Sequence, residues 1–243
     1  MALLEKTLAR TLDLFFPRNC QFCAEPLAEE HRGVVCPACL AKAKFIEPPF
    51  CQRCALPFDG KLTEPFACGY CQDMKFCFSR AVAACRAEGV VRDCIHRFKY
   101  NREMYFELHL AGWLIEAGRR EIDWRAVNGI VPVPLFPRKE RHREFNQAER
   151  LARALGKAMD VPVLSRHLWR VKETGTQTRL DKEMRRANVR DAFAVRDGKV
   201  LAGQRLVLVD DVFTTGATLD SCAKVLRQEG ALDVIALTVA RGV

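Results

Sequence analysis

The segment Leu206–Leu219, which reads LVLVDDVFTTGATL, constrains the fold more than any other part of the chain. Its first four residues are apolar, as in a parallel strand that is covered on both faces. Residues 217–229 carry apolar side chains at helical spacing. A buried strand that leads through a short turn into a helix predicts an open α/β sheet, and ligands of such sheets bind at the carboxyl ends of the strands.

The turn between this strand and this helix predicts a site for a phosphate group. It offers backbone N–H groups, hydroxyls and a helix N-terminus, all of which favour a phosphate dianion. The alternatives are a different kind of α/β phosphate binder and a plain strand, turn and helix. The turn consists of Thr214, Thr215, Gly216, Ala217 and Thr218.

Two acidic residues, Asp210 and Asp211, follow the apolar run and need a partner other than the phosphate. Two carboxylates repel an anion, whereas hydroxyl groups donate hydrogen bonds to them and hydrated Mg²⁺ binds them. The acidic pair and the turn together therefore predict a site for a phosphorylated sugar.

The thirteen residues Leu206–Thr218 resemble the phosphoribosyl pyrophosphate signature of the type I phosphoribosyltransferases. The match consists of four apolar residues, two acidic residues, two apolar residues and the sequence Thr-Thr-Gly-x-Thr. The resemblance implies that Asp210 and Asp211 bind the ribose hydroxyls at the catalytic centre. It implies as well that residues 214–218 bind the monophosphate, and that Mg²⁺ accompanies the phosphoribosyl pyrophosphate.

Four CxxC units precede this segment and predict two structural zinc ions. The spacers between the units are twelve, eleven and thirteen residues long, so the first two and the last two units each have the spacing of a Cys₄ zinc ribbon. Disulfides are disfavoured by the length of the chain and the lack of a secretory signal, and iron–sulfur clusters stay an alternative. We favour sequential ligand pairing, although a cross-braced pairing is also open. The predicted ligands are Cys20, Cys23, Cys36 and Cys39 for one ion, and Cys51, Cys54, Cys68 and Cys71 for the other.

Length and composition agree with two unequal domains. A chain of 243 residues, of which 49% are hydrophobic, can bury one large core beside a small metal-dependent unit. We expect an amphipathic N-terminal helix and the double zinc ribbon in residues 1–78, and a phosphoribosyltransferase-like domain in residues 79–243. The thiols predict a reducing, cytoplasmic location, and no apolar run reaches the ~18 residues that span a membrane.

The formal net charge of +9 suggests nucleic acid as one class of partner. Two Cys₄ zinc sites lower this charge to about +5, because their thiols lose protons. Residues 166–190 contain eight basic and three acidic residues. This excess lies next to the predicted anion site, so substrate phosphates and a nucleic-acid surface explain it equally well.

Periodicity predicts the remaining elements of an α/β domain. Strands and helices alternate along the chain, which favours a mostly parallel sheet with helices on both faces. The predicted helices span residues 103–120 and 145–159, and the predicted strands span 129–133, 167–171, 192–195 and 234–239.

Two basic segments flank the sugar site in sequence. Residues 131–149 leave a strand, turn at two prolines and form a cationic loop that is suited to a diphosphate. Residues 171–193 contain a polar, glycine-containing stretch that is suited to a mobile cover over the substrate. The cations that we expect to bind substrate are Arg138, Lys139, Arg141 and Arg143.

Taken together, these features resemble the ComF competence-protein family over nearly the whole chain. The Arg-rich loop ends in Phe145, Asn146 and Gln147, and ComF proteins usually have glycine where this chain has Glu144. The resemblance implies a role in handling imported single-stranded DNA during natural transformation. The polar segment matches the family through Thr174, Gln177, Leu180, Arg185, Asn188, Ala192 and Phe193.

Two functions of different classes follow. In the first, the protein binds phosphoribosyl pyrophosphate with Mg²⁺ and handles single-stranded DNA, with DNA-uptake proteins as partners. In the second, it is an active metabolic phosphoribosyltransferase, a glycosyltransferase whose acceptor is a nucleobase or another small molecule. Release of diphosphate in the presence of a base distinguishes the second function from the first.

Overall fold

The computed structural model describes residues 18–31, 33–60, 62, 65–72, 74–173 and 191–242. The predicted N-terminal helix lies outside these residues. So do Thr174, Gln177, Leu180, Arg185 and Asn188 of the predicted mobile cover.

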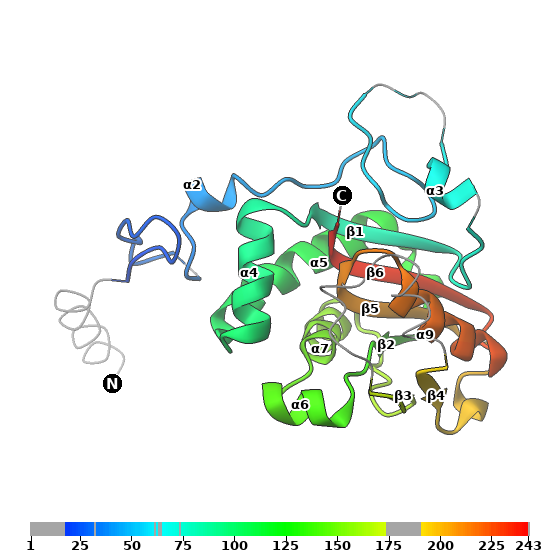
Figure 1. The fold of residues 1–243 in the computed structure, drawn as a ribbon. Coiled ribbons are helices and arrows are strands. Elements are labelled where there is room, and N and C mark those ends of the chain that lie inside the picture. The colour runs from blue at the N-terminus through cyan, green and yellow to red at the C-terminus, as the bar shows by residue number, and fades with distance from the viewer. Residues whose placement is uncertain are drawn as a thin grey trace.

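A four-stranded parallel sheet forms the centre of the protein (Figure 1). Its strands lie in the order β1, β6, β5 and β2. Pro132 on β2 pairs with Val209 on β5, so the carboxyl ends of these two strands lie next to each other. The strands are β1 (Arg80–Arg86), β2 (Gly129–Pro132), β5 (Arg205–Phe213) and β6 (Asp233–Arg241).

Helices cover both faces of this sheet, as the sequence predicts. Val207 and Val209 on β5 pack into the core with α4, α5 and α7, whereas Leu206 and Leu208 pack with α9 on the opposite face (Figure 1). Successive residues of a strand point to opposite faces, so a continuous apolar strand supplies both cores. The helices are α4 (Gly89–Tyr100), α5 (Glu107–Glu121), α7 (Gln147–Met159) and α9 (Ala217–Gln228), with short 3₁₀ turns at Met104–Phe106, Trp124–Ala126 and Gly198–Val200.

The predicted strands at 167–171 and 192–195 form a separate small sheet. They appear as β3 (Leu168–Arg170) and β4 (Phe193–Val195), which pair with each other in antiparallel orientation. Each has three residues. The expectation of strands here is confirmed, and their place beside the main sheet is a finding of the structure.

The chain between the two ribbons runs along the outer edge of β1. Phe45 forms an antiparallel bridge with Cys85, and the Ile46 N–H donates to the Ala84 carbonyl at 2.9 Å. These contacts pair part of a strand edge that would otherwise expose N–H and C=O groups.

The two ribbons pack on different parts of the sheet domain. The first ribbon, residues 18–40, contacts α4 and the turn before α5: the Phe22 and Phe106 ring centroids are 5.8 Å apart, and Arg97 Nη1 donates to the Gln21 carbonyl at 2.8 Å. The second ribbon, residues 50–72, lies near the carboxyl ends of β5 and β6. Each contains one short helix, α2 (Pro37–Leu40) and α3 (Gly69–Gln72). Both ribbons pack on the sheet domain, and these contacts do not define a boundary between two domains. The division into residues 1–78 and 79–243 stays a prediction.

Candidate phosphate site and zinc centres

Each ribbon gathers four cysteine sulfurs into one cluster. Within each cluster all four Sγ atoms lie within 4.8 Å of one another, and all the cysteines are free of disulfides. The pairing is sequential: Cys20, Cys23, Cys36 and Cys39 form one cluster, and Cys51, Cys54, Cys68 and Cys71 form the other.

The geometry of both clusters fits tetrahedral zinc. The Sγ atoms of Cys23 and Cys36 are 3.6 Å apart, and those of Cys54 and Cys68 are 3.7 Å apart. Four sulfurs at the usual zinc–sulfur distance form a tetrahedron with edges of about 3.8 Å. Corresponding N–H groups also point at sulfur in the two ribbons: Cys36 N–H donates to Cys20 Sγ, and Cys68 N–H donates to Cys51 Sγ, both at 3.3 Å. The residues therefore suit two structural zinc ions.

We expect elemental analysis of the purified protein to give two zinc equivalents per chain. Replacing Cys36 with serine should release one equivalent and unfold the first ribbon, because ribbons of this size depend on metal for most of their folding free energy. The sheet domain should keep its cooperative thermal transition. One zinc equivalent in the unmodified protein, or iron with a visible chromophore, would contradict the assignment.

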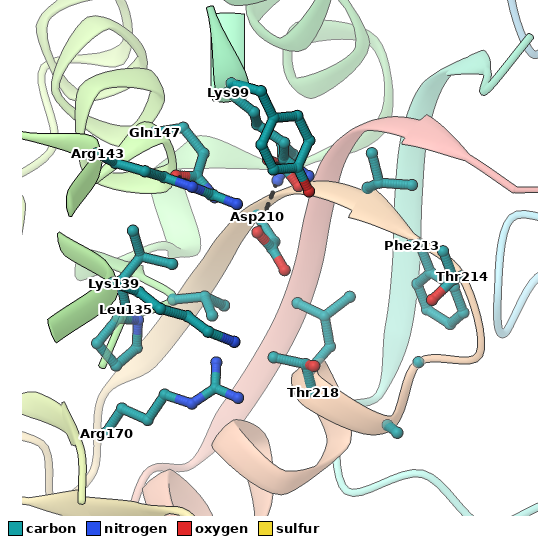
Figure 2. Close-up of a pocket in the computed structure, with 18 residues that line it drawn as sticks. Lys99, Leu135, Lys139, Arg143, Gln147, Arg170, Asp210, Phe213, Thr214 and Thr218 are labelled. Carbon is teal, nitrogen blue, oxygen red and sulfur yellow. Dashed lines mark hydrogen bonds and ion pairs between the residues drawn. The ribbon is translucent and has the colours of Figure 1, made fainter. Parts of the chain in front are cut away.

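A cavity of about 290 Å³ opens at the carboxyl ends of β2 and β5 (Figure 2). It is lined by Asp210, Asp211, most of the predicted phosphate turn and several cationic side chains. Figure 2 shows Lys139, Arg143 and Arg170 on one side of this space and Thr218 on the other. The edge of the sheet that the sequence predicts for a ligand therefore carries a hollow with groups of both charges.

The two aspartates have different surroundings, because adjacent residues of β5 point to opposite faces. Asp211 faces α4, and its Oδ2 atom lies 2.7 Å from Lys99 Nζ. Only 4% of the Asp211 side chain and 17% of the Lys99 side chain are exposed, so this ion pair is largely buried. Asp210 points into the cavity (Figure 2).

Asp210 holds its proton more tightly than an ordinary carboxyl group. Burial and the neighbouring carboxylate of Asp211 raise the pKa of Asp210 to about 7. The positive charge of Lys99 acts in the opposite direction but does not cancel this effect. A hydroxyl donor or a cation at Asp210 would relieve the cost of ionising it.

The phosphate turn, residues 214–218, brings four of its five residues to the cavity. Thr214, Gly216, Ala217 and Thr218 line it, whereas Thr215 is buried and its Oγ1 accepts a hydrogen bond from the Ala217 N–H at 3.4 Å. Gly216 has a φ of +79° and precedes the first residue of α9, so the turn ends in a helix N-terminus.

The expected cationic loop contains a helix, α6 (Pro137–Arg143). A proline at its first position is favourable, because the missing N–H has no helical acceptor there. Lys139 and Arg143, four residues apart, lie on the same side of α6 and line the cavity. Burial lowers the pKa of Lys139, and the nearby charges of Arg170 and Arg143 lower it further.

The other two predicted cations, Arg138 and Arg141, lie outside the cavity. Both are exposed on α6, and Arg138 Nη1 is 3.7 Å from Glu173 Oε2. A helix turns residues one and two positions apart to different sides, so α6 can present only part of the basic segment to one site.

Comparison with known proteins gives matches over almost the whole chain. Residues 11–75 match the double zinc ribbon domain, and residues 145–242 match the phosphoribosyl transferase domain. The chain is 30% identical to competence protein F of Haemophilus influenzae over 93% of this chain and 98% of that protein. The chain belongs to the ComF family. It is also 30% identical to the DNA utilization protein YhgH of Salmonella typhimurium, over 91% of this chain and 96% of that protein.

Among solved structures, the chain is similar to a glutamine phosphoribosylpyrophosphate amidotransferase from B. subtilis. The TM-score is 0.36 at 20% identity, and the match covers 54% of this chain. It spans 25% of the amidotransferase chain.

The departure from the usual ComF pattern, Glu144, ends α6 in a left-handed conformation with a φ of 69°. Glycine adopts this conformation without steric cost, whereas other residues do so at a penalty. The Glu144 carboxylate lies outside the cavity lining and accepts from Arg102 Nη1 at 2.7 Å. Arg102 Nη2 also donates to the His142 carbonyl at 2.9 Å, which ties this helix end to the turn after α4. The negative charge is thus neutralised away from the site.

Several cavity residues of this ComF protein are absent from the sequence-based prediction of the site, among them Arg170, Lys99 and Tyr100. Arg170 comes from β3 and is 9% exposed, and Lys99 and Tyr100 come from the end of α4. An arginine inside an otherwise apolar predicted strand was a signal for Arg170. The helical spacing of apolar residues between Val90 and Phe98 indicates α4, but its position relative to β5 depends on tertiary packing.

Proposed function

We propose that this ComF protein binds phosphoribosyl pyrophosphate together with Mg²⁺ and acts in the use of single-stranded DNA. One observation carries the first half of the proposal: a single cavity joins the phosphate turn, a buried carboxyl pair and three basic side chains from α6 and β3. A sugar that carries a monophosphate at one end and a diphosphate at the other needs each of these groups.

Each part of the cavity binds a different group of the ligand in this proposal. Backbone N–H groups of residues 214–218 bind the monophosphate at the N-terminus of α9. Asp210 accepts hydrogen bonds from the ribose hydroxyls. Lys139, Arg143 and Arg170 bind the diphosphate. Its negative charge offsets the repulsion between these three cations.

Asp210, on the acidic side of the cavity, is the residue that would hold Mg²⁺ together with the ligand. The raised pKa of Asp210 is the sign of a buried carboxyl group without enough positive charge around it. When bound, Mg²⁺ would supply positive charge to a departing diphosphate. The residues of the chain then orient the sugar and exclude water from its anomeric carbon.

Calorimetric titration with phosphoribosyl pyrophosphate in the presence of Mg²⁺ tests the ligand, and a parallel assay of diphosphate release with a panel of nucleobases tests turnover. We expect saturable binding. Diphosphate release with one base would favour the metabolic transferase, whereas binding without release favours a sensor or a DNA-handling protein. Absence of binding to the zinc-loaded protein would refute the site assignment.

The names of the relatives, competence protein F and DNA utilization protein, support the DNA half of the proposal. Phe58 on the second ribbon is 44% exposed and available for base stacking. Phe50 on the same ribbon, and Phe76 and Phe78 just after it, are buried. We propose that the protein works in the cytoplasm, where imported single strands arrive. No helix of the described segments has the length and apolar character needed to cross a membrane.

Single-stranded DNA should bind with little sequence preference. The affinity should fall steeply as the salt concentration rises, because the release of counterions drives such binding. Fluorescence anisotropy with a labelled oligonucleotide at several salt concentrations measures this. A feeble, non-saturating signal at physiological salt would leave the metabolic transferase as the better account.

Affinity for the sugar phosphate should depend on pH through Asp210. Its carboxyl group is mostly protonated at pH 6 and mostly ionised at pH 8, because its pKa is about 7. Since the ribose hydroxyls need an ionised acceptor, we expect affinity to rise about tenfold between these two pH values. The Asp210→Asn variant should lose this part of the pH dependence and keep only the part that comes from the ligand's own phosphates. An identical pH profile in both proteins would contradict the role of Asp210.

A further inference from the structure

We propose that the second zinc ribbon holds the phosphate turn in its binding conformation, with Arg241 and Tyr70 as the positioning residues that connect the two. Ligand affinity, as one readout, rests on the proposed function. The motion of the turn in the free protein is a second readout and does not depend on it.

Arg241, at the end of β6, links a zinc ligand directly to the turn. Its Nε donates to the Cys54 carbonyl at 2.9 Å, and its Nη1 donates to the Thr214 carbonyl at 2.8 Å. The guanidinium group also lies over the Phe213 ring, 4.6 Å from its centroid, and the residue is 5% exposed. Because the donors of a guanidinium group form a rigid plane, a shift of Cys54 is transmitted to Thr214.

Tyr70 makes the second link. It lies between the zinc ligands Cys68 and Cys71, and its hydroxyl donates to the Thr215 carbonyl at 3.0 Å. The C=O and N–H groups of a trans peptide point in opposite directions. When the Thr214 and Thr215 carbonyls are held toward the ribbon, the N–H groups of the following residues are directed to the other side, where the cavity lies.

Aromatic packing beneath the turn continues the same support. The Phe76 and Phe78 rings stack with centroids 4.6 Å apart, and both meet the Phe213 ring edge-on. A Cβ atom on Gly216 would lie 2.6 Å from Phe213 Cζ, so the turn sits directly on this aromatic group. Figure 2 shows Phe213 and Thr214 at the end of the turn opposite Lys139 and Arg170.

The first ribbon provides the internal comparison, because its contacts go elsewhere. Arg97 on α4 donates a hydrogen bond to the Gln21 carbonyl of the first ribbon. The Val34 N–H of this ribbon donates to His109 Nε2 on α5. Loss of zinc from the second ribbon should therefore loosen the phosphate turn, and loss of zinc from the first ribbon should not.

The mildest test removes one hydroxyl group. Tyr70→Phe keeps the ring and both zinc ions, and Tyr105→Phe is the matched control, because the Tyr105 hydroxyl bonds to Glu103 near α5. Hydrogen–deuterium exchange of the full-length protein should be faster over residues 213–218 in Tyr70→Phe and unchanged there in Tyr105→Phe. Affinity for phosphoribosyl pyrophosphate with Mg²⁺ should fall about fivefold in Tyr70→Phe, the factor expected for one lost hydrogen bond. Zinc content and the global thermal transition should stay the same.

The stronger test removes one zinc ion at a time. Cys68→Ser and Cys36→Ser replace corresponding, half-buried ligands of the two ribbons, and each should release one zinc equivalent. We expect faster exchange over residues 213–218, and at least about a tenfold loss of affinity, in Cys68→Ser alone. Equal exchange of this segment in the two cysteine variants, or unchanged exchange in both Cys68→Ser and Tyr70→Phe, would overturn the proposal.

The two hypotheses fail in different ways. If the unmodified protein does not bind phosphoribosyl pyrophosphate, the proposed function fails while the exchange data still decide whether the ribbon supports the turn. If Cys68→Ser does not fold, Tyr70→Phe decides the question by itself.

Discussion

Replacing Asp210 with asparagine should weaken the binding of phosphoribosyl pyrophosphate with Mg²⁺ at least tenfold, or about 1.4 kcal/mol. The change keeps the size of the side chain and removes the ionised acceptor that faces the cavity. Calorimetric titration at pH 8 measures the effect, since Asp210 in the unmodified protein is mostly ionised there.

The same variant should retain its stability. The pKa of Asp210 is raised in the folded protein, so the neutral form is favoured by folding, and stability is lost as pH rises from the usual carboxyl range through about 7. Asparagine stays neutral and avoids this loss. We therefore expect a melting temperature at pH 8 equal to or above that of the unmodified protein. Unchanged affinity in a folded Asp210→Asn variant would refute the site assignment.

Replacing Asp211 with asparagine should greatly lower the stability of the protein, in contrast to Asp210→Asn. It leaves the charge of Lys99 in a largely buried position without its carboxylate partner. Breaking a buried ion pair from one side costs about 3 kcal/mol or more. Urea unfolding of the ligand-free protein measures this change.

A surface ion pair gives the matched control. Glu149 and Arg153 pair on α7 at 2.6 Å, but the arginine side chain is 67% exposed. Glu149→Gln should therefore change the free energy of unfolding by at most about 0.5 kcal/mol. The double variant Lys99→Met/Asp211→Asn should recover much of the stability that Asp211→Asn loses. Equal effects of Asp211→Asn and Glu149→Gln would show that the buried pair contributes no more than a surface pair.

The separate roles of the two aspartates illustrate what the sequence predicts only in part. Adjacent acidic residues at the end of an apolar strand predict a polar site, and the family resemblance implies that both bind the ribose hydroxyls. In the structure Asp210 points into the cavity, whereas Asp211 pairs with Lys99. The sequence does not indicate that Lys99, more than a hundred positions earlier, becomes the partner of Asp211.

The basic segment after β2 shows a second limit. The sequence predicts a cationic group near the diphosphate, and Lys139 and Arg143 do line the cavity. Arg138 and Arg141 do not, because the segment forms a helix and not the loop that its sequence predicts. Arg170 enters the same cavity from a strand of the small sheet.

Local sequence determined the parts of this protein whose residues lie close together along the chain. The CxxC spacing favours the sequential pairing that both clusters confirm, and the strand, turn and helix around Gly216 follow from a few adjacent residues. Such features depend on the conformations of neighbouring residues, which side-chain type and spacing largely specify.

Tertiary structure decided which distant groups complete the site. Arg241 and Cys54, which connect the phosphate turn to the second ribbon, are 187 positions apart. Lys99 and Arg170 reach the cavity from a helix and a strand that follow β1 and β2 in the chain. These contacts arise because the central parallel sheet brings the carboxyl ends of its strands to one edge, where segments far apart in sequence meet over a common core.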